Sequence, residues 1–551
     1  MKKILLGNEA IVRAALASGV SYVTGYPGCP SAEIGDEFGK IAKENGVYAE
    51  YATNEKTALE SAIGASFSGL KVLVNMKSFG INVCSDVLLP LAYTGTKGGM
   101  VIVVADDPSC WSSAQSEQNS RMYAYLGHIP MLEPADPQEC YDFTKIGFEI
   151  SEKFNMPVIL RTVTRCAHQR AVVEVDEPHS VETPRGDFVK NPHQYSTMPP
   201  RTLEMKKELL EKIKKIQAYA EKSKINKIVG LPKSYNLKVG IIASGVAGLH
   251  VMEALEELKL DLPVLQLGSF YPLPKEKIIK FIKPLKKVLV VEELEGYVEK
   301  EIAVLAKDAN AKMEIFGKNV LPIIGELSAE KVCGALSKVV GMKFAEFKTK
   351  NLNLPKRTAR LCEGCPYWYI LPTIKRIAPE GTIFGGDIGC NMIGALPPHS
   401  MYDYLFCMGA SIGVAHGILK AEGPERSRKV ISFMGDGTFF HSGIAGMVNA
   451  VYNKSNPLMI VMDNRITAMT GHQPNPGMGK NLMGEEAPEL SIEEIAKACG
   501  VKNIKVLDPI NQKELEDVVK EFLEKEEISL IVCKKICALL LKKQTAEKHD
   551  Q

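Results

Sequence analysis

Short apolar runs alternate with stretches of helical periodicity in three blocks of this chain. Runs rich in Val, Ile and Leu that are separated by amphipathic helices are typical of parallel sheets covered by helices. The runs end in small or polar residues, at the sheet edge where α/β proteins usually bind ligands. In the first block, residues 1–190, the predicted strands are SYVTG, VYAEYA, KVLVNMK, MVIVVAD and MPVILRT.

Residues 191–235 interrupt this pattern. A Pro-rich segment, NPHQYSTMPPR, is followed by the lysine-rich LEMKKELLEKIKKIQAYAEKSK. Glu and Lys alternate there at helical spacing, which favours a linker and a solvated helix over the alternative, a charged binding patch.

Two further α/β domains are predicted, at 236–345 and 356–545. The turn Gly245-Val-Ala-Gly248 in the second block lacks the full G-x-G-x-x-G spacing of a dinucleotide site, so we interpret it as a strand-to-helix turn. The expected strands are KVGIIASG, LPVLQLG and KVLVVEE in the second block, and TIFGG, KVISFMG, PLMIVMD, NIKVL and SLIVCKK in the third. The sequence therefore predicts the α/β fold class with three parallel-sheet domains.

Composition narrows the functional classes. The 551 residues are 45% hydrophobic and 24% charged with a net charge of +2, which argues against binding nucleic acid or a membrane surface through bulk charge. No apolar run reaches the ~18 residues that span a bilayer, and the first residues lack a signal-peptide core, so we expect a cytoplasmic protein. The 13 cysteines are mostly scattered, which favours reduced thiols. Since no Cys-x-x-Cys-x-x-Cys run is present, we expect no iron–sulfur cluster in this chain.

The most specific motif lies in the third block. An apolar strand runs into Gly435-Asp436-Gly437, and 26 residues separate Gly437 from Asn464 at the end of the next strand. Two parallel strands joined by a crossover helix need about this length, so Asp436 and Asn464 are expected at the same sheet edge.

These residues predict a diphosphate and Mg²⁺ site. Asp436, the amide oxygen of Asn464 and the carbonyl of Ile466 are the hard oxygen ligands that Mg²⁺ prefers. Gly435 and Gly437 let backbone N–H groups approach phosphate oxygens at the start of a helix. A Gly-Asp-Gly alone is a common turn. The spacing, the two strands and the following Thr470-Gly471-His472-Gln473 resemble the thiamine-diphosphate motif instead.

Thiamine chemistry also needs an acidic residue, because the aminopyrimidine of the cofactor removes the C2 proton once its N1′ shares a proton with a carboxyl group. Glu55 follows the strand VYAEYA and begins a helix whose small residues permit close packing. The alternative is a first-turn glutamate that only complements the helix dipole.

Seven segments resemble, in order and across nearly the whole chain, the alpha subunit of indolepyruvate ferredoxin oxidoreductase, in the thiamine-diphosphate-dependent 2-oxo acid:ferredoxin oxidoreductase family. The segments are GYPGCPSAEI, YATNEKTALE, ADDPSCWSSAQSEQNSR, IPMLEPADPQEC, CMGASIGVAHGI, GDGTFFHSGIAG and DNRITAMTGHQPNPG. The resemblance implies a pyrimidine-binding domain at 1–190, a transketolase C-terminal-like domain at 236–345 and a diphosphate-binding domain at 356–545. It assigns pyrimidine activation to Glu55. It adds Gly409, Ala410, Thr470 and Gly471 to the cofactor site, and it implies a substrate pocket formed by Cys29, Lys77, Ser78, Tyr367, Trp368 and His472.

Several positions depart from the family pattern. Cys29 replaces a threonine, Ser78 replaces a histidine, and Tyr367-Trp368 replace histidine and arginine after Cys362-Glu-Gly-Cys365. These exchanges remove polar groups from the implied pocket, so the identity of the 2-oxo acid substrate is left open. The chain also ends without the family's cysteine-rich ferredoxin-like domain, so electrons are expected to leave through another subunit. Cys362 and Cys365 are interpreted as two reduced thiols, with zinc as the alternative.

The main hypothesis is a catalytic subunit that oxidatively decarboxylates a 2-oxo acid to an acyl-coenzyme A. The resemblance implies a smaller partner subunit, a separate ferredoxin or iron–sulfur subunit, and a dimer or hetero-oligomer, because Glu55 and the metal site lie in different domains. Two alternatives remain open. One is a non-oxidative decarboxylase or carboligase, and the other is a non-catalytic binding subunit.

Overall fold

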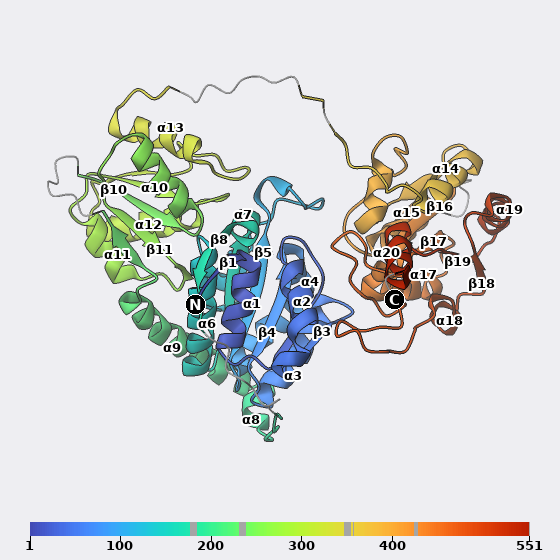
Figure 1. Ribbon diagram of the computed structural model, residues 1–551, viewed down its shortest axis with the longest axis horizontal. Helices are drawn as coiled ribbons and strands as arrows, with labels where there is room; N and C mark the ends of the chain where they lie inside the picture. The colour runs from blue at the N-terminus through green and yellow to red at the C-terminus, as the bar shows by residue number, and fades with distance from the viewer. Residues whose placement is uncertain (177–184, 231–237, 346–353, 356, 424–427, 550–551) are drawn as a thin grey trace. The chain divides into compact units, whose positions relative to one another are not determined.

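The computed structural model describes residues 1–176, 185–230, 238–345, 354–355, 357–423 and 428–549 (Figure 1). The chain forms two compact units, Met1–Asn351 and Leu352–Gln551. Each is described below by itself.

A seven-stranded sheet forms the centre of the first unit. Its order is β12-β6-β7-β5-β4-β2-β3, and all neighbours are parallel except β12 and β6. The central β5 is buried at every position because helices cover both faces. The strands are β2 (Tyr22–Gly25), β3 (Tyr48–Tyr51), β4 (Val72–Lys77), β5 (Met100–Asp106), β6 (Met131–Leu132), β7 (Val158–Val163) and β12 (Ser269–Tyr271). The helices around them are α1 (Gly7–Ala17), α2 (Ala32–Ile41), α3 (Glu55–Phe67), α4 (Ser78–Thr94), α5 (Met122–Gly127), α6 (Pro137–Phe154) and α7 (Thr164–His168), with short 3₁₀ turns at Lys43–Asn45 and Pro108–Cys110.

The second sheet of this unit has the order β14-β13-β10-β11-β9. Its edge strand β9 comes from the segment between the two predicted domains and runs antiparallel to β11. The strands are β9 (Lys227–Val229), β10 (Val239–Ser244), β11 (Val264–Leu267), β13 (Lys287–Val291) and β14 (Glu314–Phe316). The helices are α10 (Ala247–Glu257), α11 (Lys275–Ile282), α12 (Tyr297–Ala309) and α13 (Ala329–Val340).

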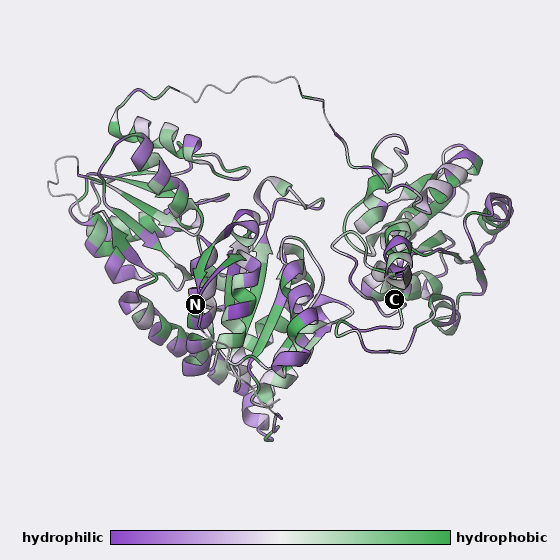
Figure 2. Cartoon of the chain, viewed as in Figure 1, coloured by the Kyte–Doolittle hydropathy of each residue, from purple (hydrophilic) through white to green (hydrophobic). Residues whose placement is uncertain are grey.

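Two features of the first unit were missed by the sequence analysis. β1 (Lys2–Leu6) and β8 (Arg170–Glu174) form a separate antiparallel pair. The segment expected to be a linker and a solvated helix contains a short helix that was missed, α8 (Pro192–Tyr195), followed by the predicted helix, α9 (Arg201–Lys222). Most of α9 that is visible in Figure 2 is hydrophilic, but it is not a fully solvated helix. It buries a stripe at helical spacing, because only that face lacks charges: Met205, Leu209, Ile213, Ile216 and Ala220.

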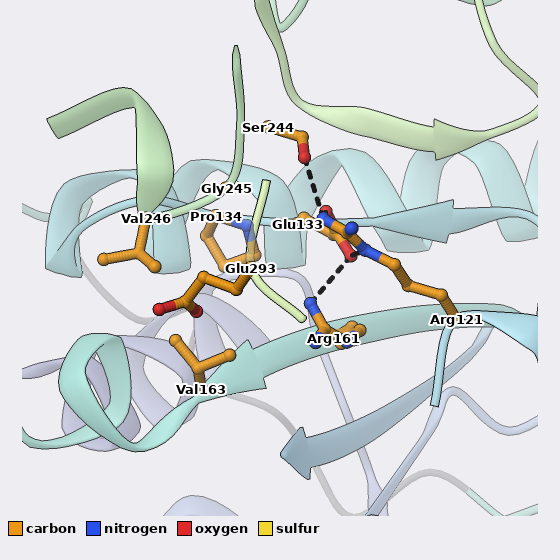
Figure 3. Close-up of a pocket in the computed structure, with 9 residues that line it drawn as sticks. All are labelled: Arg121, Glu133, Pro134, Arg161, Val163, Ser244, Gly245, Val246 and Glu293. Carbon is orange, nitrogen blue, oxygen red and sulfur yellow. Dashed lines mark hydrogen bonds and ion pairs between the residues drawn. The ribbon is translucent and has the colours of Figure 1, made fainter. Parts of the chain in front are cut away.

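A buried ion network joins the two sheets of the first unit (Figure 3). The Arg121 guanidinium donates to both carboxylate oxygens of Glu133 at 2.7 Å, to Glu292 at 2.6 Å and to Ser244 at 2.7 Å. Burial alone would raise the pKa of Glu133. The charges of Arg121 and Arg161 instead hold this pKa below its ordinary value. The cavity beside this network measures only about 10 Å³, room for one water, so we interpret the cluster as structural.

The second unit has one five-stranded parallel sheet of order β15-β16-β17-β19-β18. Figure 2 shows the hydrophobic residues gathered on the strands of the two units. The strands are β15 (Ile383–Gly385), β16 (Val430–Gly435), β17 (Leu458–Asp463), β18 (Asn503–Leu507) and β19 (Ser529–Lys534). The helices are α14 (Tyr367–Ile377), α15 (Ala410–Glu422), α16 (Asp436–Thr438), α17 (Ile444–Tyr452), α18 (Ile492–Ala498), α19 (Gln512–Leu523) and α20 (Ala538–His549), with a 3₁₀ turn at Gly389–Ala395 and a π-helical turn at Phe439–Gly443.

The predicted α/β class with parallel sheets is confirmed. Within the described ranges, no helix combines the length and the apolar character needed to cross a bilayer.

Candidate functional site

Glu55 is the first residue of α3, directly after β3. Asn54 caps this helix, since its side-chain oxygen accepts the Thr57 N–H at 2.9 Å. The Glu55 side chain is only 6% exposed although it carries a carboxyl group. It packs against the first turn of α4, where a Cβ placed on Gly80 would lie 2.6 Å from Glu55 Cγ and 2.9 Å from its Oε1. Gly80 therefore makes room for this carboxyl group.

Gly80→Ala should displace the Glu55 carboxyl group. Gly80 lies in a regular helix, so alanine suits the backbone, and the added methyl group must instead push Glu55 or Met76 aside. We expect turnover to fall by about tenfold or more, because a catalytic group that is misplaced by about 1 Å loses its alignment. Gly64→Ala on α3, where an added Cβ meets no atom within 4 Å, is the matched control. Equal turnover in the two variants would contradict the importance of the Glu55–Gly80 packing.

Three residues of the implied substrate pocket lie in the same unit as Glu55. Cys29 is half-buried and Ser78 is buried at the start of α4. The Lys77 ammonium is close enough to Cys29 and Glu55 to interact electrostatically with both. Burial raises the pKa of the Cys29 thiol and lowers that of Lys77. The structure thus brings Cys29, Lys77, Ser78 and Glu55 to one edge of the seven-stranded sheet.

Asp436 and Asn464 converge in the second unit. β16 pairs in parallel with β17, and Gly435 is in register with Met462, so both residues follow neighbouring strand ends. Asp436 is 3% exposed and Asn464 is 7% exposed. The Asn464 amide oxygen accepts the Ile466 N–H at 3.2 Å, which turns the chain back toward the strand end.

The Asp436 carboxylate has neighbours that sequence reasoning missed. Asn475 donates to it at 3.1 Å and the Gly437 N–H donates at 2.9 Å. Burial, followed by the nearby Asp463 carboxylate, raises the pKa of Asp436. A divalent cation would offset both effects, so the electrostatics of this edge fit a bound metal ion. The signal for Asn475 in the sequence was the Pro-Asn-Pro segment that carries it.

Asp387, also missed, connects the two glycine segments of the implied cofactor site. Its carboxylate accepts the backbone N–H groups of Gly409 and Gly435, each at 3.1 Å. Burial raises the pKa of Asp387 to about 6. Gly409 has φ of +77° and precedes Ala410, the first residue of α15; a Cβ on it would lie 2.5 Å from Ser442 Oγ. Only glycine suits this position.

The remaining predicted residues differ in their surroundings. Thr470 and Gly471 lie in the turn that joins Thr467 to Gln473, and Gly471 is exposed. Tyr367 is 2% exposed, and its hydroxyl accepts from the Asn464 amide at 3.4 Å. The Trp368 indole donates to the Cys362 carbonyl at 3.2 Å. His472 lies 3.7 Å from the thiol of Cys537.

Three thiols, those of Cys362, Cys365 and Cys537, lie close enough to Cys390 to interact with it electrostatically. This group of four thiols has two more members than the pair predicted from the sequence. Cys390 and Cys365 border the same apolar core, and a Cβ on Gly364 would lie 3.6 Å from the Ala538 Cβ, which brings the Cys362–Cys365 turn against Cys537. Burial, then the other three thiols, raise the pKa of Cys390 to about 12. Within the described residues, no three His, Cys, Asp or Glu side chains are spaced to hold one metal ion.

A buried amide next to these thiols has no partner. Asn391 is 1% exposed, and neither its oxygen nor its nitrogen makes a hydrogen bond with the described residues. Leaving a buried amide unpaired is costly, so the region fits a further bound group.

Two family models match the chain. Residues 13–227 match pyruvate flavodoxin/ferredoxin oxidoreductase, thiamine diP-binding, and residues 387–533 match the C-terminal TPP-binding domain of thiamine pyrophosphate enzymes.

Relatives match over nearly the full length. Indolepyruvate oxidoreductase subunit IorA of Methanothermobacter marburgensis is 43% identical over 97% of this chain and 87% of its own. The IorA subunit of Pyrococcus horikoshii is 42% identical over 98% of this chain and 86% of its own. A solved structure of 2-oxoglutarate:ferredoxin oxidoreductase from Magnetococcus marinus shares the fold, with a TM-score of 0.51 and 17% identity over 62% of this chain and 65% of that chain. The chain therefore belongs to the IorA family of thiamine-diphosphate-dependent 2-oxo acid:ferredoxin oxidoreductase subunits.

Proposed function

We propose that this chain is the catalytic subunit of an oxidoreductase that binds thiamine diphosphate through Mg²⁺ and acts on an arylpyruvate-like 2-oxo acid. The observation that carries the proposal is the convergence of Asp436 and Asn464 at neighbouring strand ends. Asp436, Asn464 and the Ile466 carbonyl would hold Mg²⁺. The backbone around Gly409, Ala410, Gly435 and Gly437, with Thr470 and Gly471 nearby, would hold the cofactor.

When bound, thiamine diphosphate would supply a carbon nucleophile and an electron sink for the chemistry of a 2-oxo acid. Glu55 would hold a proton at the aminopyrimidine N1′, which promotes loss of the C2 proton. Cys29, Lys77 and Ser78 would contact the substrate, with Tyr367, Trp368 and His472 on the diphosphate-binding domain. We accordingly propose that residues 1–190 bind the pyrimidine ring and that residues 356–545 bind the diphosphate. Residues 236–345 would form the transketolase C-terminal-like domain.

The acyl group would pass to coenzyme A, and a smaller partner subunit would complete a dimeric or hetero-oligomeric enzyme in the cytoplasm. The relatives' name supports indolepyruvate as one candidate substrate. The exchanges at Cys29, Ser78, Tyr367 and Trp368 favour a modified preference within that class.

The electron path has two candidates. The first, expected from the sequence, is an iron–sulfur cluster on another subunit or on ferredoxin. The second is a cluster held by Cys362, Cys365, Cys390 and Cys537, which the grouping of the other three thiols around Cys390 favours. A single ion would need the sulfurs at about 2.3 Å from it. The thiols are not spaced for that, whereas a four-cysteine iron–sulfur cluster occupies a wider site.

One preparation tests these proposals. The protein is purified anaerobically from its native host with any co-purifying subunit, and 2-oxo acids are assayed with thiamine diphosphate, Mg²⁺, coenzyme A and ferredoxin. We expect acyl-coenzyme A and reduced ferredoxin. Release of an aldehyde without a partner subunit or a cluster would instead support the non-oxidative decarboxylase. If calorimetry with thiamine diphosphate and Mg²⁺ showed no binding heat, the non-catalytic binding subunit would be the remaining function.

Iron and sulfide analysis distinguishes the two electron paths. If this chain holds a cluster, Cys390→Ser should lose iron, sulfide and visible absorption, while Cys499→Ser, a half-buried thiol near α18, should keep them. Equal iron content in both variants would refute the four-thiol site.

A further inference from the structure

The loop between β5 and α5, residues Asp107–Ser120, covers Lys77. The Ser112 carbonyl accepts from the Lys77 ammonium at 3.3 Å, and the Ser112 hydroxyl donates to the Cys29 carbonyl at 3.4 Å. Asp107 fixes the start of the loop, because its carboxylate accepts the Ser112 N–H at 2.7 Å and the Thr164 hydroxyl at 2.5 Å. Loop position and Lys77 position are therefore linked.

The other side of this loop is held by the domain that carries the second sheet. One Glu117 oxygen accepts two backbone N–H groups, that of Ser109 in the loop at 2.6 Å and that of Gly325 in the second domain at 2.9 Å. The Glu326 N–H donates to the Ser109 hydroxyl at 2.8 Å.

Two further hydrogen bonds also join the loop to the second domain. Asn119 donates to Glu295 at 2.9 Å, and the Trp111 indole approaches Glu326 at 3.4 Å. Ser109 and Cys110 have φ of 67° and 52°, a conformation that costs energy in non-glycine residues and persists only where surrounding contacts enforce it. The second domain supplies such contacts at Ser109.

Lys77 is suited to bind a carboxylate. Its stem packs on Gly28, where a Cβ would lie 3.0 Å from Lys77 Cγ, and its ammonium lies 4.8 Å from the centre of the Phe79 ring. The titratable groups that face it are Asp107, Cys29, Cys110 and Glu55. The Ser112 carbonyl takes one of the three ammonium protons, and a substrate carboxylate can accept another.

We propose that Lys77 binds the substrate carboxylate and that Glu117 is a positioning residue through which the second domain holds the Asp107–Ser120 loop against Lys77. The inference rests on the proposed function in that the ligand is a 2-oxo acid. It gives residues 236–345 a part in substrate recognition.

Glu117→Ala tests the positioning role. The variant loses the acceptor for two backbone N–H groups, and we expect KM for the 2-oxo acid to rise about tenfold while kcat changes less than about twofold. Glu117→Gln keeps an acceptor oxygen at the same place and should restore a near wild-type KM. Glu256→Ala, an exposed residue of α10, is the control for nonspecific effects.

The pH profile of KM separates positioning from mere stability. Burial lowers the pKa of Lys77, so binding of a carboxylate should weaken as the pH rises through this lowered value. In Glu117→Ala the loosened loop lets water reach Lys77, and the weakening should move to higher pH. A destabilised fold with an intact loop would change the amount of active protein and leave this profile in place.

Trp111 reports binding without turnover. The chain has two tryptophans, and Trp111 is 70% exposed on the loop. Adding the 2-oxo acid to the full chain should change an emission component that is absent in Trp111→Phe, and Lys77→Met should abolish the response. An unchanged KM and response in Glu117→Ala overturns the positioning role. Binding seen by Trp111 without product formation would instead refute the proposed reaction.

Discussion

Replacing Glu55 with glutamine is expected to lower turnover by about 10² or more while thiamine diphosphate binds with nearly unchanged affinity. Glutamine fills the same space beside Gly80, so packing is kept, but it cannot share a proton with the pyrimidine nitrogen. Turnover is measured with saturating 2-oxo acid, and affinity is measured by calorimetry with thiamine diphosphate and Mg²⁺.

Glu60→Gln is the matched control for Glu55. It lies on the same helix, is exposed and pairs with Lys56, so its loss should leave both turnover and affinity within about twofold of wild type. If Glu55→Gln retained full turnover, Glu55 would be no more than a first-turn residue of α3.

Asp436→Ala should weaken Mg²⁺-dependent binding of thiamine diphosphate by at least about 100-fold. Even groups that only support a metal ligand cost 10- to 100-fold in affinity when they are removed, so loss of a ligand itself should cost at least as much. Binding is measured by calorimetry at several Mg²⁺ concentrations. In the variant the affinity should no longer depend on Mg²⁺.

The free energy of unfolding, measured without cofactor, checks that Asp436→Ala loses binding through a local change and not through unfolding. Burial and Asp463 raise the pKa of Asp436, which means that its ionised form costs folding free energy. Removing it should leave the free energy of unfolding close to that of wild type. Asp517→Ala, on the exposed face of α19, is the control and should bind cofactor normally. Unchanged affinity in Asp436→Ala would refute its role as a metal ligand.

The positions of many strands along the chain were accessible from pattern alone. The predicted runs KVLVNMK and PLMIVMD are β4 and β17 with boundaries that differ by one residue. Strands that are buried on both faces need continuous apolar runs, and such runs are visible without tertiary information. Parallel neighbours also follow from the helical crossovers, which is why the adjacency of Asp436 and Asn464 could be predicted from 26 intervening residues.

Other parts could not be predicted locally. β12 leaves the second domain and pairs with β6 of the first sheet, and β9 joins the second sheet from the presumed linker. Three-residue strands have little pattern of their own, since their partners rather than their sequence determine them. The face that α9 buries likewise depends on the surface against which it packs.

The amino-acid sequence by itself determined the α/β class and predicted a metal motif around Asp436 and Asn464, because strand burial and motif spacing are local or near-local properties. The prediction that Glu55 is the acid came from the resemblance to the family, because its position alone also suits a first-turn residue of a helix. Tertiary structure alone decided that Gly80 accommodates Glu55, that Asp387 and Asn475 hydrogen-bond to Gly409 and Asp436, and that Gly325 holds the loop over Lys77. These contacts join residues far apart in the chain, and such pairings arise from packing of whole elements, which no window of sequence contains.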